Sequence, residues 1–131
     1  MIVVDASAVL DGLLDPASHA VIAKWLTGSA EPLAAPDLLD VEVMSVLRRW
    51  ERLTEITASR ARQALDDLGA LPIIRYPARA VLDQAWKLRR NLTAYDAQYV
   101  ALAQILPARL LTTDGRMADV AASTRVVVVA L

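Results

Sequence analysis

Three aspartates of this chain stand at the ends of predicted secondary-structure elements, where carboxylates can do chemistry. Asp5 follows the apolar run Ile-Val-Val, and Asp114 follows Leu-Leu-Thr-Thr. Asp96 lies three residues after Thr93, at capping-box spacing, and its helical neighbours at i+3, i+4 and i+7 are mostly apolar. Each acid could serve only as a helix cap, which would stabilise its helix by about 1 kcal/mol. Three acids in such similar settings favour a shared site instead.

A fourth acid is expected from the long helix predicted over residues 38–51. On the wheel of this helix, Glu42 lies inside the apolar arc, and Asp40 is also flanked by apolar neighbours. Periodicity alone therefore leaves both acids open as candidates. A buried carboxylate without a partner is costly, so whichever acid is buried needs a metal ion or a cation nearby.

The elements that must position these acids alternate along the chain. Strands are expected at residues 2–4, 32–35, 73–74, 110–114 and 125–131. Helices are expected at residues 6–14, 18–28, 38–51, 57–68, 78–90, 93–106 and 114–120, with Asp37, Thr57, Thr93 and Asp114 as caps and Gly69 ending the fourth. Strands alternating with helices over short connections predict an α/β fold, a parallel β-sheet flanked by helices on both faces.

Composition bounds the class of protein. The 131 residues form a single domain, residues 1–131, and 56% of them are hydrophobic. No apolar run reaches the roughly 18 residues of a membrane span, and the start Met-Ile-Val-Val-Asp lacks the basic segment of a signal peptide. We therefore expect a cytoplasmic protein that does not enter a membrane. The chain has no cysteine and a net charge of −1, which excludes thiolate metal sites and argues against a generally basic nucleic-acid-binding surface.

The predicted topology brings the acids to one place. In open parallel sheets, ligands bind beyond the carboxyl ends of the strands at the topological switch point. Asp5 and Asp114 fall on that edge, and Asp96 opens the helix leading to the strand before Asp114, so the three meet if the two strands are neighbours. Oxygen ligands without Cys or His favour Mg²⁺ or Mn²⁺. Such an ion activates water and clamps a phosphate, which predicts metal-assisted phosphoryl chemistry with Asp5, Asp96 and Asp114 as ligands.

The chain resembles the PIN domain, and within it the VapC toxins of bacterial and archaeal toxin–antitoxin pairs. The resemblance covers essentially the whole chain and is carried by Ile-Val-Val-Asp-Ala-Ser at residues 2–7, Glu42, Tyr-Asp-Ala-Gln-Tyr-Val-Ala-Leu-Ala at residues 95–103 and Leu-Leu-Thr-Thr-Asp at residues 110–114. The acidic positions of the family fall on Asp5, Glu42, Asp96 and Asp114, which favours Glu42 over Asp40. Its accessory hydroxyls fall on Ser7 and Thr112.

The resemblance also implies the activity and the partners. It implies a Mg²⁺- or Mn²⁺-dependent endoribonuclease toxin that cleaves structured RNA, commonly tRNA or rRNA. It further implies a homodimer and a cognate VapB-type antitoxin. We expect the antitoxin to cover apolar surface at Trp25, Leu26 and Trp50 and to place a basic side chain near Asp96 and Asp114.

Four arginines are candidates for contacts with the phosphates of the RNA backbone. Arg48, Arg49 and Arg52 gather at the end of the helix that bears Glu42, and Arg116 follows Asp114 closely. Guanidinium groups suit phosphate contacts. For the first three, a solvated basic surface is the alternative interpretation.

Two other functions are compatible with parts of this pattern. An aspartate-nucleophile phosphatase of the haloacid-dehalogenase type needs a second Asp two residues after the first, where this chain has Ser7. It also needs a lysine near the phosphate, whereas Lys24 and Lys87 lie inside predicted helices. The other alternative is a catalytically inactive PIN domain that acts as a partner-binding scaffold, since a side chain misplaced by about 1 Å can silence a site.

Overall fold

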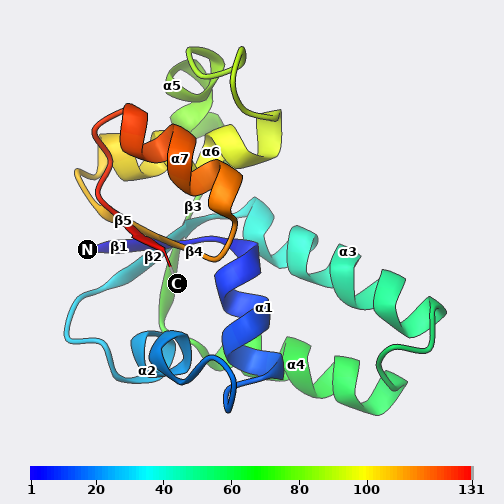
Figure 1. The fold of residues 1–131 in the computed structure, drawn as a ribbon. Coiled ribbons are helices and arrows are strands. Elements are labelled where there is room, and N and C mark those ends of the chain that lie inside the picture. Colours follow the sequence, from blue (N-terminus) through cyan, green and yellow to red (C-terminus); the bar gives the residue numbers. More distant parts are fainter. Residues whose placement is uncertain (131) are drawn as a thin grey trace.

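The structure, a computed structural model, describes residues 1–130 of the chain and the side chains of residues 1–129. Its strands form one parallel sheet in the order β3-β2-β1-β4-β5 (Figure 1). The strands are β1 (Ile2–Val4), β2 (Leu33–Pro36), β3 (Ile73–Tyr76), β4 (Arg109–Thr112) and β5 (Val128–Ala130). The strand order reverses at β1, so the topological switch point lies between β1 and β4. Leu131, the last residue of the predicted final strand, lies outside the described residues.

Helices cover both faces of this sheet, as the sequence predicts. They are α1 (Ala6–Leu14), α2 (Ala20–Gly28), α3 (Leu38–Arg52), α4 (Ala58–Ala70), the 3₁₀ helix η1 (Ala78–Val81), α5 (Leu82–Trp86), α6 (Ala94–Ile105) and α7 (Gly115–Ser123). In Figure 1, α6 and α7 lie above the sheet with α5 against α6, while α1 and α2 lie below it. Helices α3 and α4 run side by side and pack against α1. None of the helices formed by residues 1–130 is long and apolar enough to span a bilayer.

The core explains why the sequence is so apolar. All three residues of β1, Ile2 to Val4, are fully buried, because helices cover both faces of a parallel sheet. Helix α6 is buried over the seven consecutive residues 97–103, as predicted from its apolar circumference. The hydroxyl of Thr93 caps this helix by accepting the backbone N–H of Asp96 at 3.2 Å. The helix ends at Ile105, before Pro107.

The pairing of β1 with β4 places two turns next to each other. Val4 lies opposite Leu111, and the backbone N–H of Asp5 continues the ladder to the carbonyl oxygen of Leu111 at 3.2 Å. Each strand then leads directly into a helix, α1 or α7. The condition under which Asp5 and Asp114 share a crevice, that their strands are neighbours, is therefore met.

Several predicted boundaries differ from the structure: the strand expected at residues 73–74 extends to Tyr76, the strand expected at 110–114 ends at Thr112, and the last helix runs to Ser123. Three further boundaries are also wrong. The continuous helix over residues 78–90 is instead η1, the short α5 and a series of turns. This segment buries only Val81 and Ala85 deeply, and so little packing cannot sustain a long helix. Gly69 does not end α4, which continues to Ala70, because the backbone of Gly69 keeps a negative φ angle. The last strand begins at Val128 and not at residue 125.

The predicted capping role of Asp37 and the predicted apolar surface also need correction. Asp37 has helical φ and ψ angles of −65° and −15°, whereas a capping side chain needs an extended backbone, and its carboxylate accepts the N–H of Ala78 instead. Leu26 is only 1% exposed, because α2 turns it into the core, and Trp25 is half-buried with Arg109 over its ring. Trp50 is half-buried as well.

Candidate active site

Asp5 is buried at the junction of β1 and α1, with only 2% of its surface exposed. It is the N-cap of α1: one carboxylate oxygen, Oδ1, accepts the N–H of Ala8 at 2.9 Å and the hydroxyl of Ser7 at 2.8 Å. The other oxygen, Oδ2, accepts a hydrogen bond from Thr112. Burial raises the pKa of Asp5 to about 6, although these hydrogen bonds oppose the shift and the charge of Asp114 adds to it.

Two hydroxyl groups tie the turn after β1 to the turn after β4. Thr112 is fully buried; besides donating to Asp5, its hydroxyl oxygen accepts the N–H of Asp114 at 2.9 Å. The hydroxyl oxygen of Ser7 accepts the N–H of Thr113 at 3.2 Å. Because both hydroxyls bond to both turns, they fix the position of Asp5 relative to Asp114. The two residues suggested as accessory hydroxyls by the resemblance thus lie against these acids.

Asp114 and Asp96 approach this crevice from the beginnings of two helices. Asp114 caps α7 by accepting the N–H of Met117 at 3.1 Å, which occupies one of its two carboxylate oxygens. Asp96 is half-buried in the first turn of α6. Burial raises the pKa of Asp96, and the negative charge of Asp114 raises it further, whereas Thr93 and Arg116 lower it. The predicted capping of α7 by Asp114 is confirmed, and this capping acid also forms part of the cluster.

Glu42 reaches the same crevice from α3. The hydroxyl of the buried Tyr99 donates a hydrogen bond to Glu42 Oε1 at 2.6 Å. Burial raises the pKa of Glu42, as do the nearby charges of Asp96 and Asp5, while the hydrogen bond from Tyr99 lowers it. The carboxylate therefore faces the other acids, and the hydrogen bond from Tyr99 occupies only one of its two oxygens.

The alternative acid on α3, Asp40, points elsewhere. Its two oxygens accept the guanidinium of Arg75 on β3 at 2.7 and 2.9 Å. A bidentate pair of this kind satisfies the charge of Asp40. The ambiguity between the two acids of α3 is thus resolved by geometry, with Glu42 in the acidic crevice and Asp40 paired with the arginine.

Negative charge accumulates in the crevice, and the only basic group that lowers the pKa of any of these acids is Arg116, which acts on Asp96 without forming a salt bridge to it in the described structure. Within the described part of the chain, none of the four acids takes part in a salt bridge. The charges of Asp5, Asp96 and Asp114 each raise the pKa of another acid of the crevice. The pKa values of Asp5, Glu42 and Asp96 are themselves raised. The acids with these roles are Asp5, Glu42, Asp96 and Asp114.

The donors match a hard divalent cation in type, since all of them are carboxylate or hydroxyl oxygens. As the side chains of residues 1–129 stand, however, no three acids converge closely enough to hold a metal ion. Clustered carboxylates that form no salt bridge in the described structure nevertheless fit a cation that draws them together. The residues present therefore fit Mg²⁺ or Mn²⁺ in donor chemistry and in charge.

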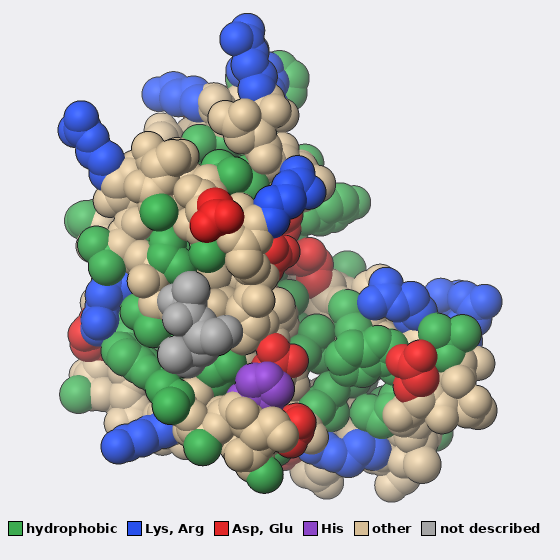
Figure 2. Space-filling model, viewed as in Figure 1, with side chains coloured by type: hydrophobic (Ala, Val, Ile, Leu, Met, Phe, Trp, Pro, Cys, Tyr) green, Lys and Arg blue, Asp and Glu red, His purple; other side chains and the backbone are tan. Residues whose placement is uncertain are grey.

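The four candidate arginines divide into two groups. Arg116 is exposed in the first turn of α7 and close enough to Asp96 to lower its pKa. Arg48, Arg49 and Arg52 are also exposed, but they lie six to ten residues beyond Glu42, which is about 9–15 Å along the helix. Figure 2 shows basic side chains gathered over that outer half of α3, away from the red acidic surface of the crevice.

Sequence reasoning missed the polar role of Tyr99. Tyr99 is the i+3 neighbour of Asp96, and by helical spacing alone it belongs to the mostly apolar face. The signal was present, because a tyrosine one turn after a candidate acid brings a hydroxyl to the same crevice. A buried tyrosine hydroxyl usually finds a hydrogen-bond partner, and here the partner is Glu42.

Comparison with known proteins decides the family. A family model described as the PIN domain matches residues 2–123. The chain belongs to the PIN-domain family. Among curated PIN-domain relatives, Ribonuclease VapC9 of Mycobacterium tuberculosis is 43% identical over 120 residues, which cover 91% of this chain and 90% of that protein.

Solved structures agree with the PIN-domain fold. A Pyrobaculum aerophilum protein, PAE2754, superposes with a TM-score of 0.69 and 28% identity over 98% of this chain and 83% of its own. VapC20 of Mycobacterium tuberculosis, described as a toxin that cleaves the sarcin–ricin loop, has a TM-score of 0.66 and 18% identity over 91% of this chain and 94% of its own. The second likeness is a likeness of fold.

Proposed function

We propose that this PIN domain is a Mg²⁺- or Mn²⁺-dependent endoribonuclease toxin of the VapC type, active in the cytoplasm on structured RNA such as tRNA or rRNA. The observation that carries the proposal is the crevice at the switch point of the sheet, where four carboxylates gather with no salt bridge in the described chain. The name of the relative VapC9, a ribonuclease that is 43% identical, supports RNA as the substrate.

The residues of the crevice take different roles in the proposed mechanism. Asp5, Asp96 and Asp114 would hold the cation, which when bound supplies an activated water and neutralises phosphate charge. Ser7 and Thr112 hold Asp5 in place through the hydrogen bonds they donate to it. Among the four acids, only Asp5 is nearly fully buried, so it anchors the cluster.

Glu42 is the proposed proton acceptor of the mechanism. Tyr99 occupies Oε1 of this carboxylate and fixes its direction. The other oxygen, Oε2, is then available to accept a proton from the attacking water. Burial raises the pKa of Glu42, which makes it a better base than an exposed carboxylate would be.

The substrate backbone needs positive charge beside this acidic site. Arg116 is the best placed of the four candidates, since it lies close to Asp96 and is exposed. We propose that it contacts the phosphate next to the scissile bond. The Arg48, Arg49 and Arg52 group would contact phosphates further along the RNA.

We also propose a cognate VapB-type antitoxin and a homodimer as partners. Half-buried apolar side chains lie on the neighbouring helices α1, α3 and α4 and on the loop that joins α3 to α4, where a partner's amphipathic helix could pack. They are Leu13, Val46, Trp50, Leu65 and, in the loop, Ile56. The acidic crevice would accept an arginine from the same partner. Exposed Val41 and Met44 on α3, 61% and 52% exposed, offer further apolar surface that self-association would cover.

The test is a cleavage assay on total RNA with purified protein, in EDTA and after addition of Mg²⁺ or Mn²⁺, followed by sequencing of the new 5′ ends. Metal-dependent cuts at defined positions that disappear in Asp114→Asn are expected. The scaffold alternative has one observation in its favour, the lack of three converging acids within the described residues. A calorimetric Mn²⁺ titration separates the two, because a scaffold has no need to bind the ion through these acids.

A further inference from the structure

A second feature lies on the opposite side of α6 from the acids. A pocket of about 580 Å³ opens between α5 and the first turns of α6, a volume in the range of small-ligand sites. From α6 it is lined by Thr93, Ala94, Ala97 and Gln98, whereas Asp96 and Tyr99 face the acidic crevice. The two sites are therefore separated by the width of one helix, about 10 Å.

An unpartnered polar side chain lies at the inner wall of this pocket. Gln98 is only 7% exposed, and its Oε1 makes no hydrogen bond in the described structure. A buried amide without partners costs stability, so its presence calls for an explanation. An amide carries both donors and an acceptor, and turning it over exchanges the two ends. Gln98 can therefore donate to a ligand that enters the pocket through its nitrogen or, once the amide is turned over, accept from it through Oε1.

The outer wall offers an aromatic surface. Trp86 is 66% exposed and lines the pocket beside Leu82 and Leu92. The guanidinium of Arg89 lies 4.5 Å from the centre of that ring and donates to the carbonyl oxygen of Trp86 at 2.9 Å. Both the indole and a guanidinium held in this way are surfaces on which bases stack.

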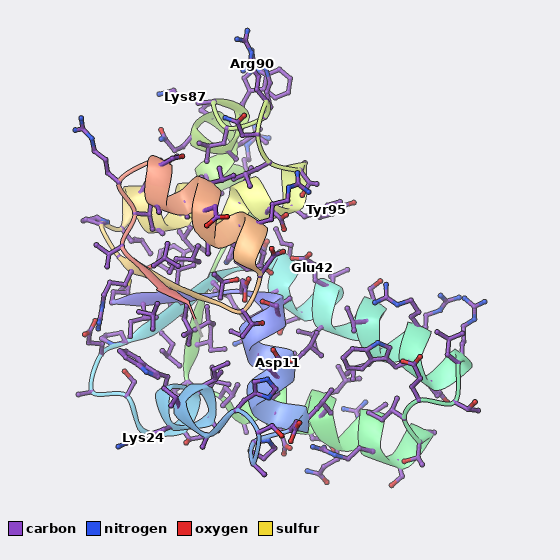
Figure 3. The ribbon with its side chains drawn as sticks, in the orientation of Figure 1. Asp11, Lys24, Glu42, Lys87, Arg90 and Tyr95 are labelled. Atoms are coloured by element: carbon purple, nitrogen blue, oxygen red, sulfur yellow. The ribbon has the colours of Figure 1, made fainter. Side chains whose placement is uncertain are left out.

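Basic side chains accompany the pocket: Arg89 lines it, and Lys87 and Arg90 are its close neighbours in the sequence. Lys87, Arg89 and Arg90 follow one another closely after α5 and are exposed, while Asp83 is the only acid among the lining residues. Figure 3 shows Lys87 and Arg90 projecting outward at the end of the molecule that carries α5. An aromatic, amide-bearing pocket with an arginine in its lining and further basic residues next to it in the sequence matches a nucleotide, whose phosphate stays outside while its base enters.

We propose that this pocket binds one unpaired nucleobase of the RNA substrate, stacked on Trp86 and hydrogen-bonded through its edge to Gln98. The base belongs to a nucleotide a few positions from the scissile phosphate, since the chain of the RNA must pass around the start of α6 to reach the acids. RNA as the source of the base rests on the proposed function; the base pocket itself does not. It gives the enzyme a sequence preference that the acidic crevice, which contacts phosphate, cannot supply.

The test measures binding in the absence of cleavage. The full chain in EDTA is titrated with each of the four ribonucleoside 5′-monophosphates by calorimetry, while the side-chain amide resonance of Gln98 is followed by NMR. One nucleotide is expected to bind more tightly than the others and to shift that resonance. Gln98→Leu should weaken its binding about tenfold and reduce the preference between bases. Trp86→Leu, at a site exposed enough to leave the core intact, should weaken all four by about tenfold.

Tyr95→Leu is the matched control, because Tyr95 is an aromatic of similar exposure, 64%, that does not line the pocket. Equal binding of all four nucleotides, or binding unaffected by Trp86→Leu, would overturn the proposal. So would sedimentation data in which Trp86→Leu dissociates a dimer while no nucleotide binds, since a second copy of the chain would then fill the pocket. Loss of the proposed ribonuclease activity is a separate result, seen only in the cleavage assay.

Discussion

The hydroxyl of Tyr99 on α6 donates a 2.6 Å hydrogen bond to the carboxylate of Glu42 on α3, across the acidic crevice. Burial and the hydrogen bond to Glu42 raise the pKa of Tyr99 far above its ordinary value, so the hydroxyl stays protonated and keeps donating. We predict that Tyr99→Phe lowers kcat for RNA cleavage by up to about 100-fold with little change in KM, because Glu42 loses its fixed direction. Steady-state kinetics on a defined RNA measure both constants.

A double-mutant cycle separates this positioning role from a general loss of packing. If Tyr99 acts through Glu42, adding Tyr99→Phe to Glu42→Gln should change kcat little beyond the single variant. Tyr76→Phe, at a half-buried tyrosine of β3, is the control and should leave both constants unchanged. Equal effects of Tyr99→Phe in both backgrounds would show that the hydroxyl works independently of Glu42.

Asp5 makes the stability of the metal-free protein depend on pH. Burial raises its pKa from 3.8 to about 6, so the folded protein holds this proton more tightly than the unfolded chain. The free energy of unfolding is therefore expected to fall as pH rises from about 4 to about 6, by on the order of 2 kcal/mol, and to level off above that. Asp5→Asn should reduce this slope, leaving the part that Glu42 and Asp96 contribute through their own raised pKa values, and should raise the Tm at neutral pH. Denaturant titrations in EDTA across this range measure it, and an unchanged slope in the variant would exclude Asp5 as its source.

Loss of either acid at the helix starts should abolish metal-dependent cleavage. Asp96→Asn and Asp114→Asn each remove one proposed ligand while keeping the size of the side chain and, for Asp114, an oxygen that can cap α7. We expect activity in Mn²⁺ to fall at least about 100-fold and the affinity for Mn²⁺ to fall with it. Asp119→Asn is the matched control, an exposed acid on α7 that should retain full activity. Wild-type cleavage by both site variants would refute the ligand assignment.

The arginines should differ in how they affect binding to RNA. Arg116→Ala, next to the crevice, is expected to lower kcat/KM by about tenfold, because it contacts phosphate near the reacting bond. Replacing Arg48, Arg49 and Arg52 with alanine should mainly weaken binding and flatten its dependence on salt, by a slope of about one for each phosphate that is no longer neutralised. Binding measured at several salt concentrations decides this, and an unchanged slope would assign the three side chains to an ordinary solvated surface.

Local signals in the sequence were enough to predict much of this fold. Thr93 and Asp114 cap helices where the sequence placed the caps, because a capping side chain bonds to a backbone N–H only a few residues away. The apolar run 2–4 and the helix after Thr93 needed only their own hydrophobicity to be recognised. Such elements are specified within a single segment of chain.

Features that depend on distant contacts could not be predicted in the same way. Asp40 and Glu42 look alike on the helical wheel, and only Arg75, 35 residues from Asp40, and Tyr99, 57 residues from Glu42, distinguish them. The sequence also could not show that α2 turns Leu26 inward. The sequence also does not determine the order of the strands. This order brings Asp5 beside Thr112, 107 residues away, and the sequence analysis could only assume it.

The last prediction concerns control of the proposed ribonuclease. An amphipathic helix of the antitoxin packed among α1, α3 and α4 would cover Trp50, and an arginine from the same partner would enter the acidic crevice. We therefore expect the protein purified from its native host to arrive with a small partner that inhibits cleavage. Trp50→Ala should release the partner and restore cleavage, whereas Trp86→Ala, on the far side of the molecule at α5, should leave the complex intact. Thermal unfolding of both variants checks that they fold. If the partner still inhibits the Trp50→Ala variant, it binds another surface of the protein. If the protein purifies alone, cleaves RNA and does not harm its cells, the inhibitor does not exist.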